Sequence, residues 1–160
     1  MDGLVIRAAV DSDKRAVEKI AKECWAPIYE GYKAQLGDEI YGLVYSVDPL
    51  QVKAEKVSSA VSEGRVLVAE LEGVVCGFAT FLYESENVGS LKDNAVSPDF
   101  KGRGIAAKLY EAVFEKLRGF GCRVVRVGTG LDDAHAPARH AYEKAGFEKE
   151  LSNVTYFKKL

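Results

Sequence analysis

The stretch from Val88 to Val127 places the tightest constraint on the fold of this chain. A strand candidate from Val88 to Val96 stops at Ser97-Pro98-Asp99, and a glycine-containing segment follows it. The residues after that segment carry apolar side chains at the spacing of one helix face: Ile105, Leu109, Ala112, Val113, Leu117 and Phe120. A second strand is predicted from Val124 to Val127. A strand, a helix and a strand in this order predict a crossover between two parallel strands.

An antiparallel hairpin is predicted before this crossover, because two β-favouring runs, 66–69 and 74–81, flank the turn pair Glu72-Gly73. The other expected elements are a strand over 4–6, a helix capped by the side chains of 11–13, short helical pieces and turns over 29–45, a helix from Asp48-Pro49 to Gly64, a short helix closed by Gly146 and a final strand over 154–157. We therefore expect one α/β domain over residues 1–160, with a mixed, mostly antiparallel sheet flanked by helices.

Charge and cysteine usage exclude several classes of protein. With 22 Lys and Arg against 24 Asp and Glu, the net charge of −2 predicts no nucleic-acid partner, so any anion site must be local. Cys24, Cys76 and Cys122 lie far apart in apolar runs, which is typical of small buried side chains and not of a disulfide framework or a zinc site. No apolar run approaches the roughly 18 residues of a membrane span. We expect a cytoplasmic protein that needs no metal and binds no membrane.

The segment Lys101-Gly102-Arg103-Gly104-Ile105-Ala106 is the strongest candidate for a ligand site. Two glycines let successive backbone N–H groups point into one concavity, and the helix behind them adds unpaired donors and a partial positive charge. Such a loop binds phosphate or pyrophosphate, although a glycine-rich turn with solvated cations is the plainer interpretation of these residues alone. The chain has no GxxxxGK[ST] motif. A dinucleotide fingerprint fits poorly, because four residues separate the loop from its strand and only one crossover is evident.

Two motifs in this region resemble those of the GNAT N-acetyltransferases. The family's Q/R-x-x-G-x-G/A motif, after a strand that ends in Val-x-Pro, is similar to residues 94–106, which read NAVSPDFKGRGIA. Its second motif, N-x-x-A-x-x-x-Y-x-x-x-G-F, is similar to residues 135–147, which read HAPARHAYEKAGF. Lys101 replaces the usual Gln or Arg, and His135 replaces the usual Asn. The resemblance covers Asn94 to Phe147, is supported by the hairpin and fades in the N-terminal third.

The resemblance implies a GNAT-like fold with a splayed central strand pair, and acetyl-CoA as the co-substrate. The strand that ends at Val96 would pair with the pantetheine arm as a neighbouring strand does, since a splayed edge has unpaired N–H and C=O groups. Cofactor contacts are therefore expected from Asn94, Ala95, Val96, Lys101, Gly102, Arg103, Gly104, Ile105, Ala106 and His135. His135 also fits a second role, as the cap of the following helix.

The implied reaction is acetyl transfer to a primary amine by direct attack. A lysine-like amine with a pKa of about 10.4 is mostly protonated at pH 7, which adds roughly 4.6 kcal/mol to the barrier. Tyr142 matches the family's general acid, although its place on an apolar helix stripe also fits simple packing. The family's usual base position falls near Ser90, so Glu84, Glu86 and Asp93 are weaker base candidates that also fit solvated charges.

The N-terminal half would supply the acceptor site. Its aromatic and acidic residues suit a cationic amine, although tyrosines at helical spacing also fit packing; they are Trp25, Tyr29, Tyr32, Tyr41, Tyr45, Glu23, Glu30, Asp38 and Glu39. The acceptor is expected to be a small-molecule or peptide amine, and the resemblance also allows a homodimer. The alternative function is a non-catalytic acyl-CoA-binding sensor or regulatory module.

Overall fold

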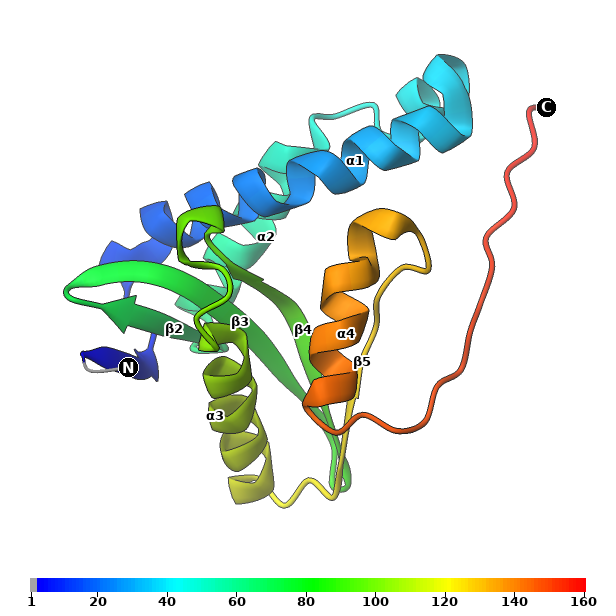
Figure 1. Cartoon of the computed structure of the whole chain (residues 1–160). Helices are drawn as coiled ribbons and strands as arrows, with labels where there is room; N and C mark the ends of the chain where they lie inside the picture. Colours follow the sequence, from blue (N-terminus) through cyan, green and yellow to red (C-terminus); the bar gives the residue numbers. More distant parts are fainter. Residues whose placement is uncertain (1–2) are drawn as a thin grey trace.

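The computed structural model describes residues 3–160 as a five-stranded sheet with helices on both faces (Figure 1). Neighbouring strands pair in the order β1-β2-β3-β4-β5, antiparallel from β1 to β4 and parallel between β4 and β5. The elements in chain order are β1 (Leu4–Ala8), α1 (Lys14–Val44), α2 (Pro49–Ser62), β2 (Val66–Leu71), β3 (Val74–Ser85), β4 (Val88–Val96), α3 (Ile105–Gly119), β5 (Val124–Val127) and α4 (Ala136–Lys144), with short 3-10 helices at Asp11–Asp13, Pro98–Phe100 and Asp133–His135. The predicted mixed, mostly antiparallel α/β fold is confirmed.

Two apolar cores cover the two faces of the sheet. Val66 and Val68 of β2 pack with α1 and α2, whereas Leu67 and Ala69 pack with α3 on the opposite face. Successive residues of a strand point to opposite faces, so a strand buried on both sides carries an unbroken apolar run. The predicted hairpin lies at this centre, and its turn uses Glu72 and Gly73 at φ 50° and 80°.

The predicted helix starts had mixed outcomes. Asp48 accepts a hydrogen bond from the Leu50 N–H (2.9 Å) and caps α2 as expected. The cap expected from residues 11–13 is wrong, because the Asp13 carboxylate accepts instead from the Val10 N–H (2.8 Å) and pairs with Arg7 of β1 (2.7 Å). Asp13 is buried, so it takes the partner with a full positive charge.

Helix α1 is longer than the pattern of 29–45 indicates. It continues to Val44 and is interrupted at Gly37, whose φ of 74° and ψ of 162° let the chain reverse. The segment after Gly37 folds back, so that the Tyr45 ring packs on Tyr29 (centroids 5.5 Å apart) and on Tyr32 (6.3 Å). Contacts between distant tyrosines therefore hold a helix that local spacing does not predict.

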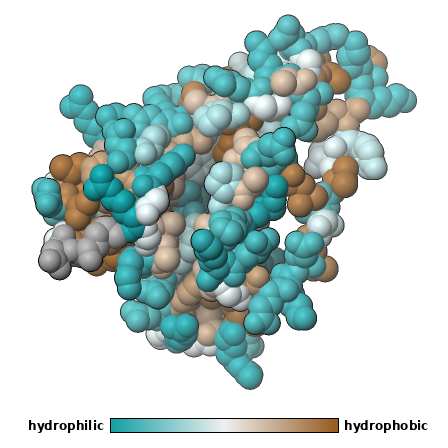
Figure 2. Space-filling view, viewed as in Figure 1, coloured by the Kyte–Doolittle hydropathy of each residue, from teal (hydrophilic) through white to brown (hydrophobic). Residues whose placement is uncertain are grey.

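The predicted final strand over 154–157 is wrong. The segment 148–160 is exposed and extended, and Figure 1 shows it running apart from the sheet toward the far end of α1, where Lys159 pairs with Glu39 (2.7 Å). A strand needs a partner for its backbone groups, and β-favouring residues alone do not supply one. Leu151, Val154 and Tyr156 of this segment are exposed, and brown, hydrophobic surface is visible on this side of the molecule in Figure 2.

The burial of the cysteines and the polarity of the helices were both expected from the sequence. Cys76 and Cys122 are buried and Cys24 is half-buried, and all three are free thiols. Within residues 3–160, every helix is too short or too polar to cross a membrane.

Candidate active site

Strands β4 and β5 separate at their C-terminal ends, as predicted. Their pairing stops at Leu91 and Val127, while β4 continues to Val96. The register of β4 against β3 shifts at the same point, where Lys92 and Asp93 together face Thr80. This extra residue is a β-bulge, which bends a strand and increases its twist. The bulge therefore turns β4 away from β5 and opens an edge along residues 92–96.

The backbone of this open edge presents the groups of Asn94 and Val96. Ser97 donates its N–H to the Cys76 carbonyl of β3 (2.9 Å), and peptide groups alternate in direction along an antiparallel pair. Ala95 therefore points its N–H and C=O toward β3, whereas Asn94 and Val96 point theirs away from it. The Cys24 thiol of α1 donates to the Val96 carbonyl (Sγ to O 3.4 Å). Of the three predicted contact residues, Asn94 and Val96 offer backbone groups at this edge, and Ala95 does not.

The bulge also aims the Asn94 side chain at two buried tyrosines. Residues three apart in a regular strand face opposite sides, but the inserted residue places Asn94 on the same face as Leu91, toward α3. Tyr110 of α3 donates its hydroxyl to Asn94 Oδ1 (2.8 Å), and Asn94 Nδ2 donates to the Tyr142 hydroxyl oxygen (3.0 Å). Asn94 Nδ2 also donates to the Lys92 carbonyl (3.0 Å), which only accepts, so the amide orientation is fixed.

The phenols of Tyr110 and Tyr142 both stay protonated at neutral pH. Burial is the main cause that raises the pKa of Tyr142, and the charge of Asp93 adds to it, while the hydrogen bond from Asn94 acts in the opposite direction. Burial and the neighbouring Tyr142 raise the pKa of Tyr110. Because Tyr142 accepts from Asn94 and does not donate to it, its own proton is available for another acceptor. This is the arrangement that a general acid needs.

The glycine-containing loop between β4 and α3 is exposed and carries free backbone donors. Gly102 and Gly104 adopt φ of 76° and 70°, which favours glycine, and Gly104 is the N-cap of α3. The first N–H bonded within the helix is that of Lys108, which donates to the Gly104 carbonyl (3.3 Å), so the earlier N–H groups of the first turn are free for an anion.

The other residues predicted to bind the cofactor at this loop differ in which groups they present to the anion site. Lys101 and Arg103 lie exposed beside it, and the Arg103 guanidinium lies 5.3 Å from the centre of the Phe100 ring. Ile105 buries its side chain in the core and Ala106 is half-buried, so these two offer the site their backbone.

His135 lies at the start of α4 and faces α1. Its side chain does not cap the helix, contrary to the second role considered for it. Instead Nδ1 lies 2.7 Å from Asp132 Oδ2, and the ring stacks on Tyr32 at a centroid distance of 6.2 Å. Burial alone would raise the pKa of Asp132, but the contact with His135 outweighs it and holds this pKa below its usual value. Arg139 fixes the same loop through the Gly130 and Asp132 carbonyls (2.7 and 2.8 Å).

Two of the carboxylates considered as bases, Glu84 and Asp93, form ion pairs with lysine and arginine side chains. Glu84 accepts from the Ser90 hydroxyl and pairs with Arg126 (2.7 Å) and Lys92 (3.4 Å), and these partners lower its pKa to about 2. Asp93 pairs with two lysines of α2, Lys53 (2.7 Å) and Lys56 (2.9 Å); these outweigh burial, which alone would raise its pKa, and lower it.

Carboxylates with lowered pKa values are weak bases, so the structure speaks against Glu84 and Asp93 in that role. Glu86 is exposed at the hairpin turn, at the other end of β4 from the open edge.

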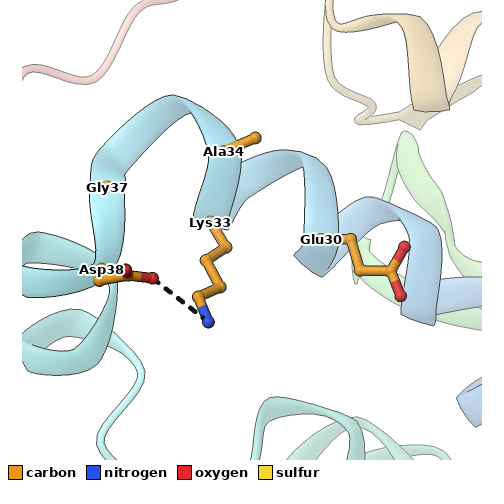
Figure 3. A pocket seen from close by; sticks show the side chains of 5 residues that line it. All are labelled: Glu30, Lys33, Ala34, Gly37 and Asp38. Atoms are coloured by element: carbon orange, nitrogen blue, oxygen red, sulfur yellow. Dashed lines mark ion pairs between the residues drawn. The ribbon is translucent and has the colours of Figure 1, made fainter.

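The tyrosines expected to line an acceptor site pack on one another, whereas the four acidic residues expected with them lie exposed at the surface of α1. The tyrosine rings contact one another, and three of the four acids pair with lysines: Glu23 with Lys19 (3.7 Å), Asp38 with Lys33 (3.3 Å) and Glu39 with Lys159 (2.7 Å). The fourth, Glu30, is exposed. Figure 3 shows Lys33 and Asp38 pointing toward each other at the Gly37 break, beside a shallow hollow of about 450 Å³. The hollow lies on α1 alone, so it is not the open edge of β4.

Sequence reasoning missed Tyr110, whose hydroxyl holds Asn94 in place. A tyrosine on the otherwise apolar inner face of α3 needs a polar partner when it is buried, and this was the available sign. The bulge that creates the site leaves no comparable mark, because it is a property of strand register.

Comparison with known proteins agrees with this geometry. The model of the acetyltransferase (GNAT) family matches residues 16–147. The aminoglycoside N-acetyltransferase AAC(6')-Iy in complex with CoA is similar at a TM-score of 0.68 and 19% identity, over 98% of this chain and 95% of that one. The PaiA N-acetyltransferase of Thermoplasma acidophilum in complex with coenzyme A is similar at a TM-score of 0.71 and 17% identity, over 94% and 92%.

An aminoglycoside acetyltransferase from an uncultured soil metagenomic sample, in complex with sisomicin, is similar at a TM-score of 0.60 and 19% identity, over 99% of this chain and 97% of that one. No curated protein matches the sequence significantly. At these identities the solved structures establish the fold, and the family model covers most of the chain. The chain therefore belongs to the GNAT acetyltransferase family.

Proposed function

We propose that this protein transfers the acetyl group of acetyl-CoA to a primary amine by direct attack of the amine on the thioester. The observation that carries the proposal is the hydrogen-bonded chain from Tyr110 through Asn94 to Tyr142, placed at the open edge of β4. It puts a protonated phenol beside backbone groups of β4 that face away from β3 and pair with no strand, and such groups suit an amide-bearing arm. The resemblance of both sequence motifs to those of the family supports the same assignment.

The substrate-binding part of the proposal assigns acetyl-CoA to two places. The loop from Lys101 to Gly104 and the first turn of α3 bind its pyrophosphate through free N–H groups and two cations. The pantetheine arm pairs with the backbone of Asn94 and Val96 along the open edge. His135 lies in the 3-10 helix just before α4, against Tyr32 of α1, and a contact with the arm is expected there.

In the chemical step, the amine nitrogen forms a bond to the carbonyl carbon, and the carbon–sulfur bond then breaks. Tyr142 donates its proton to the departing thiolate, and the proton lost by the amine restores the phenol through solvent. The Asn94 N–H that already points at the Tyr142 oxygen stabilises the phenolate formed for that moment. Asn94 thus acts as a positioning residue, and Tyr142 is the catalytic acid.

Loss of the amine proton is assigned to solvent. Glu84 and Asp93 are held ionised by their cations, which makes them poor proton acceptors. The neutral fraction of an amine rises about tenfold per pH unit below its pKa. Turnover at subsaturating amine is therefore expected to rise with pH by the same factor.

Calorimetry of acetyl-CoA binding to protein freed of bound ligand tests the proposal. We expect micromolar binding, no comparable binding of NADP, and loss of acetyl-CoA binding in Gly104→Glu, which places a carboxylate beside the phosphate site. Gly73→Glu is the matched control, since Gly73 also has a positive φ of 80° and open space around its Cα but lies in the β2–β3 turn. Wild-type protein that binds no acetyl-CoA would overturn both the transferase and the acyl-CoA sensor.

A further inference from the structure

Two groups of charges flank the start of the β4–β5 opening, and each holds one more cation than anion. Glu84 contacts Lys92 and Arg126, and Asp93 contacts Lys53 and Lys56. We name these six residues the cationic patch. Both carboxylates have lowered pKa values and remain ionised at neutral pH, so each group carries a net charge of one positive unit. The chain as a whole carries a net charge of −2, so the sign of the patch is opposite to that of the whole chain.

The Glu84 half of the patch lies on the face of the sheet opposite α3 and α4. Val125 and Val127 pack into the core beneath α3, so Arg126 between them points the other way. Leu91 packs into the same core, and its neighbour Ser90, which pairs with Arg126 in the register, also faces away from α3. Asp93 reaches this side too, since its partners are on α2.

This face is the one left to the acceptor under the proposed function. The phosphate-binding loop leads into α3, and Tyr142 projects from α4, so acetyl-CoA occupies the α3 and α4 side of the opening. An amine that attacks the thioester in the opening then arrives past Lys92 and Arg126. Arg126 uses Nη2 for Glu84, and its side chain is 68% exposed, which leaves the rest of the guanidinium for an anion.

We propose that the acceptor is a small amine that also carries a carboxylate, and that Arg126 and Lys92 bind this carboxylate. An arginine fork matches a carboxylate with two parallel hydrogen bonds, and a neighbouring lysine adds a point charge. The same net positive charge repels polycationic amines. The inference rests on the proposed function and narrows its acceptor to amines of the amino-acid type.

The test compares α-amino acids with their own amides, such as phenylalanine with phenylalaninamide and serine with serinamide, by thiol release from acetyl-CoA. The amide form has an amine of lower pKa, so rates are compared per neutral amine over a range of pH. We expect each amino acid to exceed its amide in kcat/KM by about tenfold or more, the usual weight of a charge-assisted hydrogen bond. Arg126→Gln is expected to lower that ratio several-fold, to the part contributed by Lys92, and Arg123→Gln, which removes an exposed arginine just before β5, is expected to keep it.

Each of the following results would overturn either this inference or the proposed function. Amides or polyamines acetylated as well as amino acids, or a ratio that Arg126→Gln leaves as it was, would overturn this inference and leave the proposed acetyltransfer standing. A preference for phosphoethanolamine over every amino acid would overturn the carboxylate assignment. Binding of acetyl-CoA without thiol release from any of these amines would overturn the proposed function itself.

Discussion

Replacing Tyr142 by Phe tests the general acid most sharply, because it removes one oxygen atom from a defined hydrogen-bonded chain. Asn94 Nδ2 would keep the Lys92 carbonyl (3.0 Å) for one of its two N–H groups, and the other N–H, which now points at the Tyr142 oxygen, would lose its acceptor. The cost in folding free energy is expected to be about 1–3 kcal/mol, typical of a buried donor left without its partner. General acids contribute roughly a hundredfold to ten-thousandfold to rate.

The expected size of the rate effect follows from the leaving group. A thiol with a pKa of about 8.5 leaves as a fairly stable anion, so help from an acid is worth the lower end of that range. We expect kcat to fall about a hundredfold, equivalent to about 2.7 kcal/mol, with acetyl-CoA affinity maintained. The assay is steady-state thiol release together with calorimetric binding.

Tyr110→Phe is the matched control for this variant. It removes a phenol oxygen from the other end of the same chain, where Tyr110 donates to Asn94 Oδ1 (2.8 Å), and it leaves the Tyr142 hydroxyl in place. We expect a similar loss of stability and a much smaller loss of kcat. Near-normal turnover by Tyr142→Phe, or an equally large loss in Tyr110→Phe alone, would refute the assignment of the acid.

Four further predictions concern individual residues. Gly104→Ala is expected to lower the free energy of unfolding by about 1–2 kcal/mol, because φ of Gly104 is 70°. Gly119→Ala, within α3, is expected to leave the free energy of unfolding unchanged or to raise it. Equal free energies of unfolding for the two variants in denaturant titrations would contradict this prediction. Asp93→Asn leaves the largely buried Lys53 without its partner, so a loss of about 3–5 kcal/mol is expected by the same titration, and a loss under 1 kcal/mol would contradict it. The pKa of Asp93 is lowered from 3.8, so its contribution is present above about pH 4 and disappears as the pH falls through the lowered value; acid unfolding of Asp93→Asn should lack that component. The thiols of Cys76 and Cys122 are buried, and burial raises the pKa of Cys76, so an aromatic disulfide reagent should label them only after unfolding.

Local patterns were enough to predict most of the sheet and its helices. The hairpin around Glu72-Gly73 and the cap at Asp48 depend on residues close together in the chain, and the crossover from β4 to β5 follows from the order strand, helix, strand. The predictions that failed depend on distant partners. Asp13 turned to Arg7, and the segment over 154–157 found no strand to pair with.

The residues of the candidate site likewise divide into those that local sequence predicts and those that depend on distant partners. The glycine loop is visible as spacing, because its backbone conformation is set locally, whereas the role of Tyr142 is implied by the resemblance of residues 135–147 to the family's second motif. The aim of Asn94 depends on a bulge in β4, and the loss of Glu84 as a base depends on Arg126 from another strand. Such features arise from register and from charge pairs across strands, which spacing along one chain does not encode.

Transfer of isotopically labelled acetyl from acetyl-CoA to an amine in a single turnover tests the central claim most directly. Wild-type protein saturated with labelled acetyl-CoA and mixed with an excess of amine should place the label on the amine nitrogen, as seen by mass spectrometry, and Tyr142→Phe should do so far more slowly. Label that stays on CoA with every amine offered, in protein that binds acetyl-CoA fully, would contradict the account and identify an acyl-CoA-binding module instead.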